Sequence, residues 1–189
     1  FGNLGRARQA FSTRRVDLGL ACRLIREGYQ PRPGDVVLAE VVTLGQHARI
    51  ENLSGRRGAL YRGDEIIVAY GNRYAPDQFE AYVPSDLSPC HLVAGGGVAS
   101  AMTVRHARMK MPTEIRPIGV LADDAGRPIN LADFRLRASP EARRPVLTIA
   151  VLGSSMNAGK TTTAAGIIHG LTRAGLKVGA AKLMGTGSG

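Results

Sequence analysis

The chain has 189 residues, of which 44% are hydrophobic, enough for one large domain or two small ones with their own cores. The sequence holds no uncharged apolar run of about 18 residues and no signal-peptide apolar region, which argues against a membrane span or secretion. Cys22 and Cys90 lack CxxC spacing, so neither a disulfide framework nor a zinc ribbon is indicated. We therefore expect a soluble cytoplasmic protein with no membrane partner.

The net charge of +10 is concentrated at the two ends of the chain. Residues 1–34 hold seven arginines against two acidic residues, and residues 141–189 hold six basic residues against Glu141, whereas residues 35–140 hold twelve of each sign. An arginine-rich arm can bind a polyanion, but the balanced middle of the chain disfavours a nucleic-acid partner. A second explanation of the excess is that the chain continues beyond Gly189 into an acidic segment.

Residues 1–33 are predicted to form an Arg-rich arm and one amphipathic helix. Ser12 or Thr13 can cap this helix, and apolar residues recur at every fourth position from Val16 to Leu24. Gly28 is placed to end the helix.

Residues 34–138 are predicted to form a β-rich, barrel-like domain. Short β-branched runs alternate there with glycine- and proline-containing turns, a pattern typical of an antiparallel sheet or small barrel. In one run Phe79, Ala81 and Val83 fall on one face, and Gln78, Glu80 and Tyr82 fall on the other. The predicted strands cover residues 35–42, 46–51, 65–70, 78–83, 98–106 and 115–121.

A polar, proline-bracketed linker is predicted at residues 139–145, and a different architecture follows it at residues 146–189. Residues 146–152 form a continuous apolar run typical of a strand buried in a parallel sheet. A glycine-bounded loop, a helical stretch over residues 161–174 and a second apolar run over residues 176–183 come next. The order predicts a βαβ unit.

The loop has the residue types of a phosphate-binding site. A glycine turn between a strand and a helix directs backbone N–H groups and the positive end of the helix dipole at one spot. Lys160 can reach terminal phosphates, and the Thr161 hydroxyl is placed to ligate Mg²⁺. The candidate nucleotide-binding residues are Gly153, Ser154, Ser155, Met156, Asn157, Ala158, Gly159, Lys160, Thr161 and Thr162.

The stretch from Gly153 to Thr161 resembles the loop of dethiobiotin synthetase and the cobyric acid synthases, in which five residues rather than four separate the two glycines. The resemblance covers only residues 146–189. It implies an α/β, Rossmann-like P-loop domain, ATP (or GTP) with Mg²⁺, and phosphoryl activation of a carboxylate. It also implies catalytic roles for Lys160 and for Lys182, which would contact the substrate or the terminal phosphate. Ser155 stands where the related partitioning ATPases carry a lysine, which disfavours that group.

The sequence therefore predicts part of an ATP-dependent synthetase or kinase that acts on a small carboxylate-type substrate. The alternative is a nucleotide-dependent switch or scaffold whose β-rich domain binds a partner. No carboxylate follows Glu141, so the metal-holding acid of phosphoryl transfer is missing, and we expect the domain to be incomplete and the 189-residue chain to be inactive. A second copy of the chain, forming a homodimer, is one of the surfaces that could cover the apolar runs.

The β-rich part contains weaker candidates for a metal site and for a nucleic-acid site. Cys90, His91 and His106 could ligate a metal, although their spacing matches no zinc pattern, and Asp123–Gly126 reads as a turn before it reads as a metal loop. Several aromatic residues could stack on single-stranded nucleic acid, although sheet packing explains them more simply. These are Tyr61, Tyr70, Tyr74, Phe79 and Tyr82.

Overall fold

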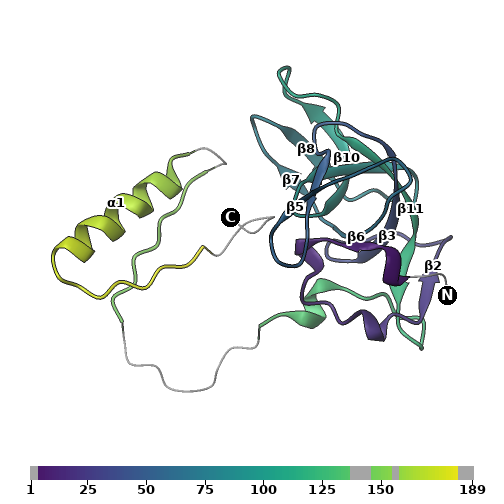
Figure 1. The fold of residues 1–189 in the computed structure, drawn as a ribbon, viewed down its shortest axis with the longest axis horizontal. Coiled ribbons are helices and arrows are strands. Elements are labelled where there is room, and N and C mark those ends of the chain that lie inside the picture. The colour runs from purple at the N-terminus through teal and green to yellow at the C-terminus, as the bar shows by residue number, and fades with distance from the viewer. Residues whose placement is uncertain (1–3, 137–145, 155–157, 183–189) are drawn as a thin grey trace. The chain divides into compact units, whose positions relative to one another are not determined.

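The computed structural model describes residues 4–136, 146–154 and 158–182. The chain divides into two compact units, which we name the β unit, Phe1–Arg135, and the helical unit, Leu136–Met184. Figure 1 shows the strands of the β unit and α1, the one α-helix of the described residues. The predicted linker at residues 139–145 lies outside the described residues.

The predicted fold class is wrong, because the described structure is mostly sheet and is not an α/β, Rossmann-like P-loop fold. Its one α-helix is α1, Lys160–Arg173, close to the predicted 161–174. Segments 146–152 and 176–182, expected to be parallel strands beside this helix, have no strand structure. A strand needs a neighbour that pairs with its N–H and C=O groups. Among the described residues neither segment has such a neighbour.

Eleven strands make up the described part of the β unit, and all six predicted runs contain one of them. Five strands were not predicted: β1, β2, β5, β7 and β9. In chain order the strands are β1 (Arg8–Gln9), β2 (Arg23–Ile25), β3 (Val36–Thr43), β4 (Arg49–Glu51), β5 (Arg57–Ala59), β6 (Glu65–Tyr70), β7 (Arg73–Tyr74), β8 (Phe79–Tyr82), β9 (Cys90–Ala94), β10 (Val98–Arg105) and β11 (Thr113–Ala122).

Nine of these strands form one mixed sheet that closes on itself. The pairing runs β6–β3–β11–β9–β10, and β10 then pairs with β6 in parallel, with Val98 beside Ala69. The antiparallel strands β8 and β7 extend outward from β10, β1 adds in parallel to β6, and β2 pairs with β11. β4 and β5 form a separate hairpin. Closure of the circuit leaves the five central strands without a free edge.

Strand β3 shows how the two sides of this sheet are filled. Val37, Ala39 and Val41 point into the main core, whereas the alternate residues Val36 and Leu38 belong to a second cluster on the opposite face. All five are at most 4% exposed. A strand buried on both faces reads as a continuous apolar run rather than an alternating one, as Val36–Val41 does apart from Glu40.

The second face is covered by the N-terminal segment, which does not form the predicted amphipathic helix. Short 3₁₀ turns occupy Phe11–Thr13 and Leu18–Leu20, and strand β2 follows. Asp17 accepts a hydrogen bond from the Gly19 backbone N at 2.9 Å, a local turn that competes with a helix. Gly19 adds a helix penalty of about 1 kcal/mol. Pairing of β2 with β11 then supplies the backbone hydrogen bonds that a helix would have made.

Candidate functional site

The candidate site is the loop that leads into helix α1. The helix begins at Lys160, directly after Gly159, whose φ of 76° lies in the left-handed region. A side chain at position 159 would be strained in this conformation, so glycine fits the sharp entry into the helix. Ser155, Met156 and Asn157 lie outside the described residues, whereas Gly153, Ser154 and residues 158–162 are described.

The loop folds back so that the aliphatic part of the Lys160 side chain lies against Gly153. A Cβ atom added at Gly153 would be 2.9 Å from Lys160 Cγ and 3.1 Å from Ala158 Cβ. Any larger residue at position 153 would therefore push Lys160 away from the loop. This contact joins the first glycine of the motif to its lysine, two residues that are seven positions apart in sequence.

The start of the helix is electropositive. The first turn of α1 has no acidic residue, and Gly159 provides no side-chain cap. Thr163 N donates to Gly159 O at 2.9 Å, the bond that joins the first turn of the helix to the loop. The N–H groups at the start of an α-helix lie before its first i→i−4 bonds and point out of its N-terminal end. Thr161 and Thr162 are exposed beside them. Together these groups favour an anion.

The C-terminal end of the helix is closed by its own backbone. Gly175 has a φ of 80°. Its N–H donates to Thr172 O, and Leu176 N donates to Leu171 O, both in the pattern of a Schellman motif. The helix bounds are thus fixed by a glycine at each end. Lys182 lies exposed beyond this end, and the described residues include no hydrogen bond or ion pair from it to the loop.

The candidate metal ligands that the sequence suggested in the β unit are not brought together as a metal site. Cys90 and His91 are neighbours on β9, so their side chains point to opposite faces of the sheet. Burial raises the pKa of the Cys90 thiol to about 12, and His91 Nδ1 accepts a hydrogen bond from Met102 N at 3.2 Å. Asp123 is engaged by Arg127 N and Arg127 Nε in a turn, as predicted. Within the described ranges no group of three or more His, Cys, Asp or Glu residues could hold a metal ion.

A buried carboxylate, Asp35, has a structural role. It is 2% exposed, and it accepts hydrogen bonds from Tyr29 Oη, Arg32 N and Asn130 Nδ2 at 2.7–2.9 Å. Burial and the bond to Asp35 raise the pKa of Tyr29 to about 12. These bonds use the carboxylate to join the start of β3 to the segment after β11. The network holds the barrel together rather than presenting a reactive group.

An open cleft of ≈ 550 Å³ lies between residues 26–30 and 85–88 of the β unit. Its charged side chains, Arg26, Glu27 and Asp86, have opposite signs. Asp86 already accepts a hydrogen bond from Ser88 N at 2.9 Å, and its bonds to Ser88 lower its pKa. The cleft therefore has no dominant charge that would select one class of ligand.

The aromatic residues separate into a buried group and an exposed group, and the sequence pattern distinguishes the two groups only within β8. Tyr70 and Phe79 are 1% exposed and belong to the core, whereas Tyr61, Tyr74 and Tyr82 are 66%, 64% and 48% exposed. Packing thus accounts for only two of the five. The predicted alternation in β8 is confirmed for these residues, because Phe79 and Ala81 are buried and Tyr82 is exposed.

None of the protein-family models, curated proteins or solved structures compared with the chain matches it. Among the described residues, no helix has the length and apolar character needed to cross a membrane. The function is therefore inferred from the residues of the loop and of helix α1.

Proposed function

We propose that the chain binds the phosphate groups of a nucleoside triphosphate, ATP or GTP, together with Mg²⁺, at residues 153–162. The observation that carries this proposal is the contact of the Lys160 side chain with Gly153 at the start of a helix that has no acidic residue in its first turn. The proposal rests on the loop and the helix start, and not on the fold of the surrounding chain.

Each residue of the site has a distinct part in this proposal. The backbone N–H groups of Lys160, Thr161 and Thr162 would donate to phosphate oxygens, and the helix dipole adds to the attraction. The Lys160 ammonium would neutralise the terminal phosphates through charge-assisted hydrogen bonds. The Thr161 hydroxyl would be one ligand of Mg²⁺, a cation that prefers oxygen ligands and retains several of its waters. The described residues of the helical unit contain no carboxylate that would repel the phosphates.

We further propose that the nucleotide serves an ATP-dependent synthetase or kinase reaction on a small carboxylate. In such a reaction a carboxylate oxygen of the substrate attacks the terminal phosphorus, and ADP leaves with the electrons of the broken phosphorus–oxygen bond. Lys182 would supply a second positive charge near the transferred group. This step is supported by the resemblance of the loop and by the basic character of the helical unit.

Lys160→Ala tests the binding proposal. We expect the variant to bind ATP or GTP at least about tenfold more weakly in isothermal calorimetry with Mg²⁺, because it loses the charge-assisted contact to the terminal phosphates. Lys177→Ala is the matched control, since it removes an equal charge from the same unit beyond the end of the helix. Equal weakening by both variants, or no effect of Lys160→Ala, would contradict a specific site.

Gly153→Ala tests the loop geometry separately. The added methyl group must displace the Lys160 side chain, so we expect weaker binding without any change of charge. Release of ADP in the presence of a panel of small carboxylic acids distinguishes the enzyme from the alternative, a nucleotide-dependent switch. Tight binding without ADP release from any acid would favour the switch.

A further inference from the structure

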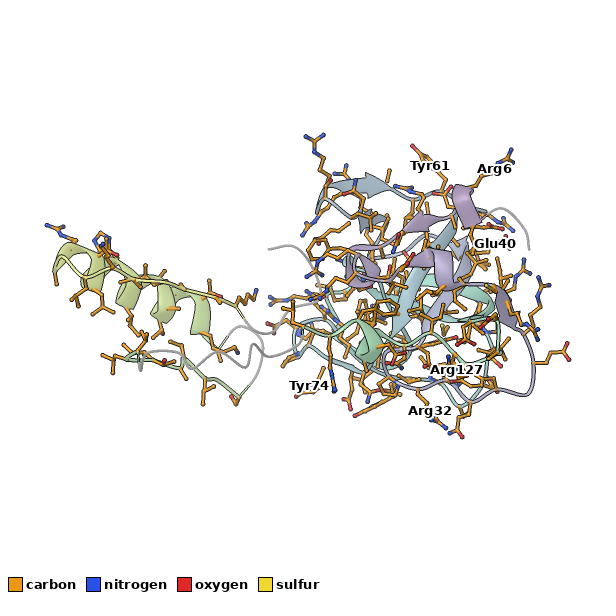
Figure 2. The ribbon with its side chains drawn as sticks, turned by 90° about the horizontal axis from the view of Figure 1, so that it is seen from below. Arg6, Arg32, Glu40, Tyr61, Tyr74 and Arg127 are labelled. Carbon is orange, nitrogen blue, oxygen red and sulfur yellow. The ribbon has the colours of Figure 1, made fainter. Side chains whose placement is uncertain are left out.

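The outward face of strands β7, β8 and β10 carries an unusual set of side chains. Tyr74 of β7 lies opposite Glu80 of β8, and Glu80 lies opposite Val104 of β10, so the three form one row across the sheet. Tyr82 stands two residues beyond Glu80 on the same face. Tyr74, Tyr82 and Val104 are 64%, 48% and 56% exposed. The three strands lie together in Figure 1, and Tyr74 projects from the surface of the β unit in Figure 2.

The side chains on the inner side of the same strands form part of the core, whereas those on the outer face do not. Phe79 and Ala81 are buried in a cluster with Val93, Ala94 and Val98. The alternate positions in a strand that faces water are ordinarily polar, so two exposed tyrosines and a valine need a different explanation. We name the outward set of Tyr74, Glu80 and Tyr82 the tyrosine face.

Glu80 is the one charged side chain of the tyrosine face, in a chain of net charge +10. The basic residues on the two neighbouring strands, Arg73 and Arg105, lie opposite the buried positions Ala81 and Phe79 of β8 and not opposite Glu80. Arg73 donates a hydrogen bond to Gln78 at 2.8 Å, and Arg105 donates one to Met109 O.

Glu80 is held in place but keeps its charge available. Tyr82 Oη donates a hydrogen bond to Glu80 Oε1 at 2.5 Å, and this bond raises the pKa of Tyr82. Four other acidic residues, Glu40, Glu51, Asp64 and Asp123, form ion pairs with arginines. Among the described residues Glu80 has no such ion pair.

We propose that the tyrosine face binds an arginine-bearing peptide segment of a partner protein. A guanidinium group is planar and weakly hydrated, so it can stack on an exposed tyrosine ring and donate to a carboxylate at the same time. Tyr74 and Tyr82 are diagonal neighbours on paired strands, positions that lie about 7–8 Å apart and within reach of aromatic side chains, and Glu80 stands between them. The similar alternative is a nucleic acid whose bases stack on the rings. The negative charge of Glu80 favours a guanidinium group over that alternative, because a carboxylate repels the phosphates of a nucleic acid.

The test is titration of the chain with a capped tetraarginine peptide, read by calorimetry and by tyrosine fluorescence. The chain has five tyrosines and no tryptophan, so tyrosine emission reports directly on the rings. We expect saturable binding that Tyr74→Ala, Tyr82→Ala and Glu80→Gln each weaken about fivefold or more. Tyr82→Phe retains the ring and should bind more tightly than Tyr82→Ala. Since the chain as a whole repels a cationic peptide, binding must come from a local site.

Matched controls lie elsewhere on the β unit. Tyr61→Ala removes a tyrosine of similar exposure, and Glu65→Gln removes an exposed carboxylate of β6. Neither should change the affinity. Should an alanine variant of the face fail to fold, Tyr74→Leu keeps an apolar side chain and still removes the ring. Absence of binding, equal weakening by the controls, or tighter binding of oligothymidine than of tetraarginine would overturn the proposal.

Discussion

His47 illustrates how one buried side chain links the stability of the β unit to pH. Burial, followed by the charge of Arg73, lowers the pKa of His47 from 6.5 to about 4. Its ring packs against Phe79 with centroids 5.7 Å apart, and Nδ1 is buried without a hydrogen-bond partner in the described structure. A proton on this ring would thus be placed next to another cation and away from water.

We predict that the stability due to His47 is fully present above pH 6.5 and is lost as the pH falls toward 4. In that window the unfolded chain binds a proton that the native chain does not, so acid favours unfolding. The loss of unfolding free energy should be on the order of 3 kcal/mol. Urea unfolding at a series of pH values measures this loss, and His47→Phe should reduce the dependence of the unfolding free energy on pH.

His169→Gln, at an exposed position of α1, is the control and should leave that dependence unchanged. If the unfolding free energy of His47→Phe depends on pH as steeply as that of the parent chain, His47 is not the group responsible.

At the scale of elements, the turn between β9 and β10 fixes the N-terminal segment to the barrel. Gly97 has a φ of 99°, and its carbonyl oxygen accepts a hydrogen bond from Ser12 Oγ at 2.7 Å, while Gly96 O accepts one from Ser12 N at 2.8 Å. A Cβ at Gly97 would lie 2.2 Å from the Cβ of the buried Ala10. The glycine is thus required both by the backbone and by close packing.

Gly97→Ala should destabilise the chain more than Gly63→Ala. Both positions have a positive φ, 99° and 88°, but a Cβ at Gly63 meets no atom within 4 Å. The Gly63 variant should therefore lose about 1–2 kcal/mol from backbone strain, and the Gly97 variant should lose about 1–3 kcal/mol more from overpacking. Chemical denaturation monitored by circular dichroism compares the two. Equal losses would show that the contact with Ala10 does not matter.

At the scale of the whole molecule, the two units differ in how much apolar surface they bury. All three clusters of buried residues, with the side chains packed on them, are made from residues between Leu4 and Phe134. In the helical unit Val146, Leu147 and Leu152 are 78%, 90% and 87% exposed. Among the described residues, the stabilisation that comes from burying apolar side chains in a core therefore belongs to the β unit.

Limited trypsin digestion should leave a resistant fragment that ends near Arg137. The core of the β unit needs no residue after Phe134, so cleavage at Arg137 or Arg143 should not unfold it. Mass spectrometry identifies the fragment, and its circular dichroism spectrum should retain the β signal. Earlier cleavage within residues 34–122 would contradict an independently stable β unit.

Local patterns predicted much of this molecule. The six strand runs were recognisable because strand residues alternate or cluster over short distances, and helix α1 because glycine bounds it on both sides. The loop residues Gly153, Lys160 and Thr161 were proposed as a site from their place before a predicted helix and from the resemblance of the loop, and the nucleotide they would bind stays a prediction.

Tertiary contacts determined the remainder. Residues 16–24 have helical spacing, yet the apolar outer face of β3 and the edge of β11 draw them into 3₁₀ turns and a strand. The apolar runs 146–152 and 176–182 read as strands, but pairing is a property of two segments, and in the described structure neither finds a partner. Likewise, alternation placed Glu80 and Tyr82 on one face, but only the register of β7 and β10 added Tyr74 and Val104 to it. Hydrogen-bond partners distant in sequence decide which face meets water, and a single segment carries no record of them.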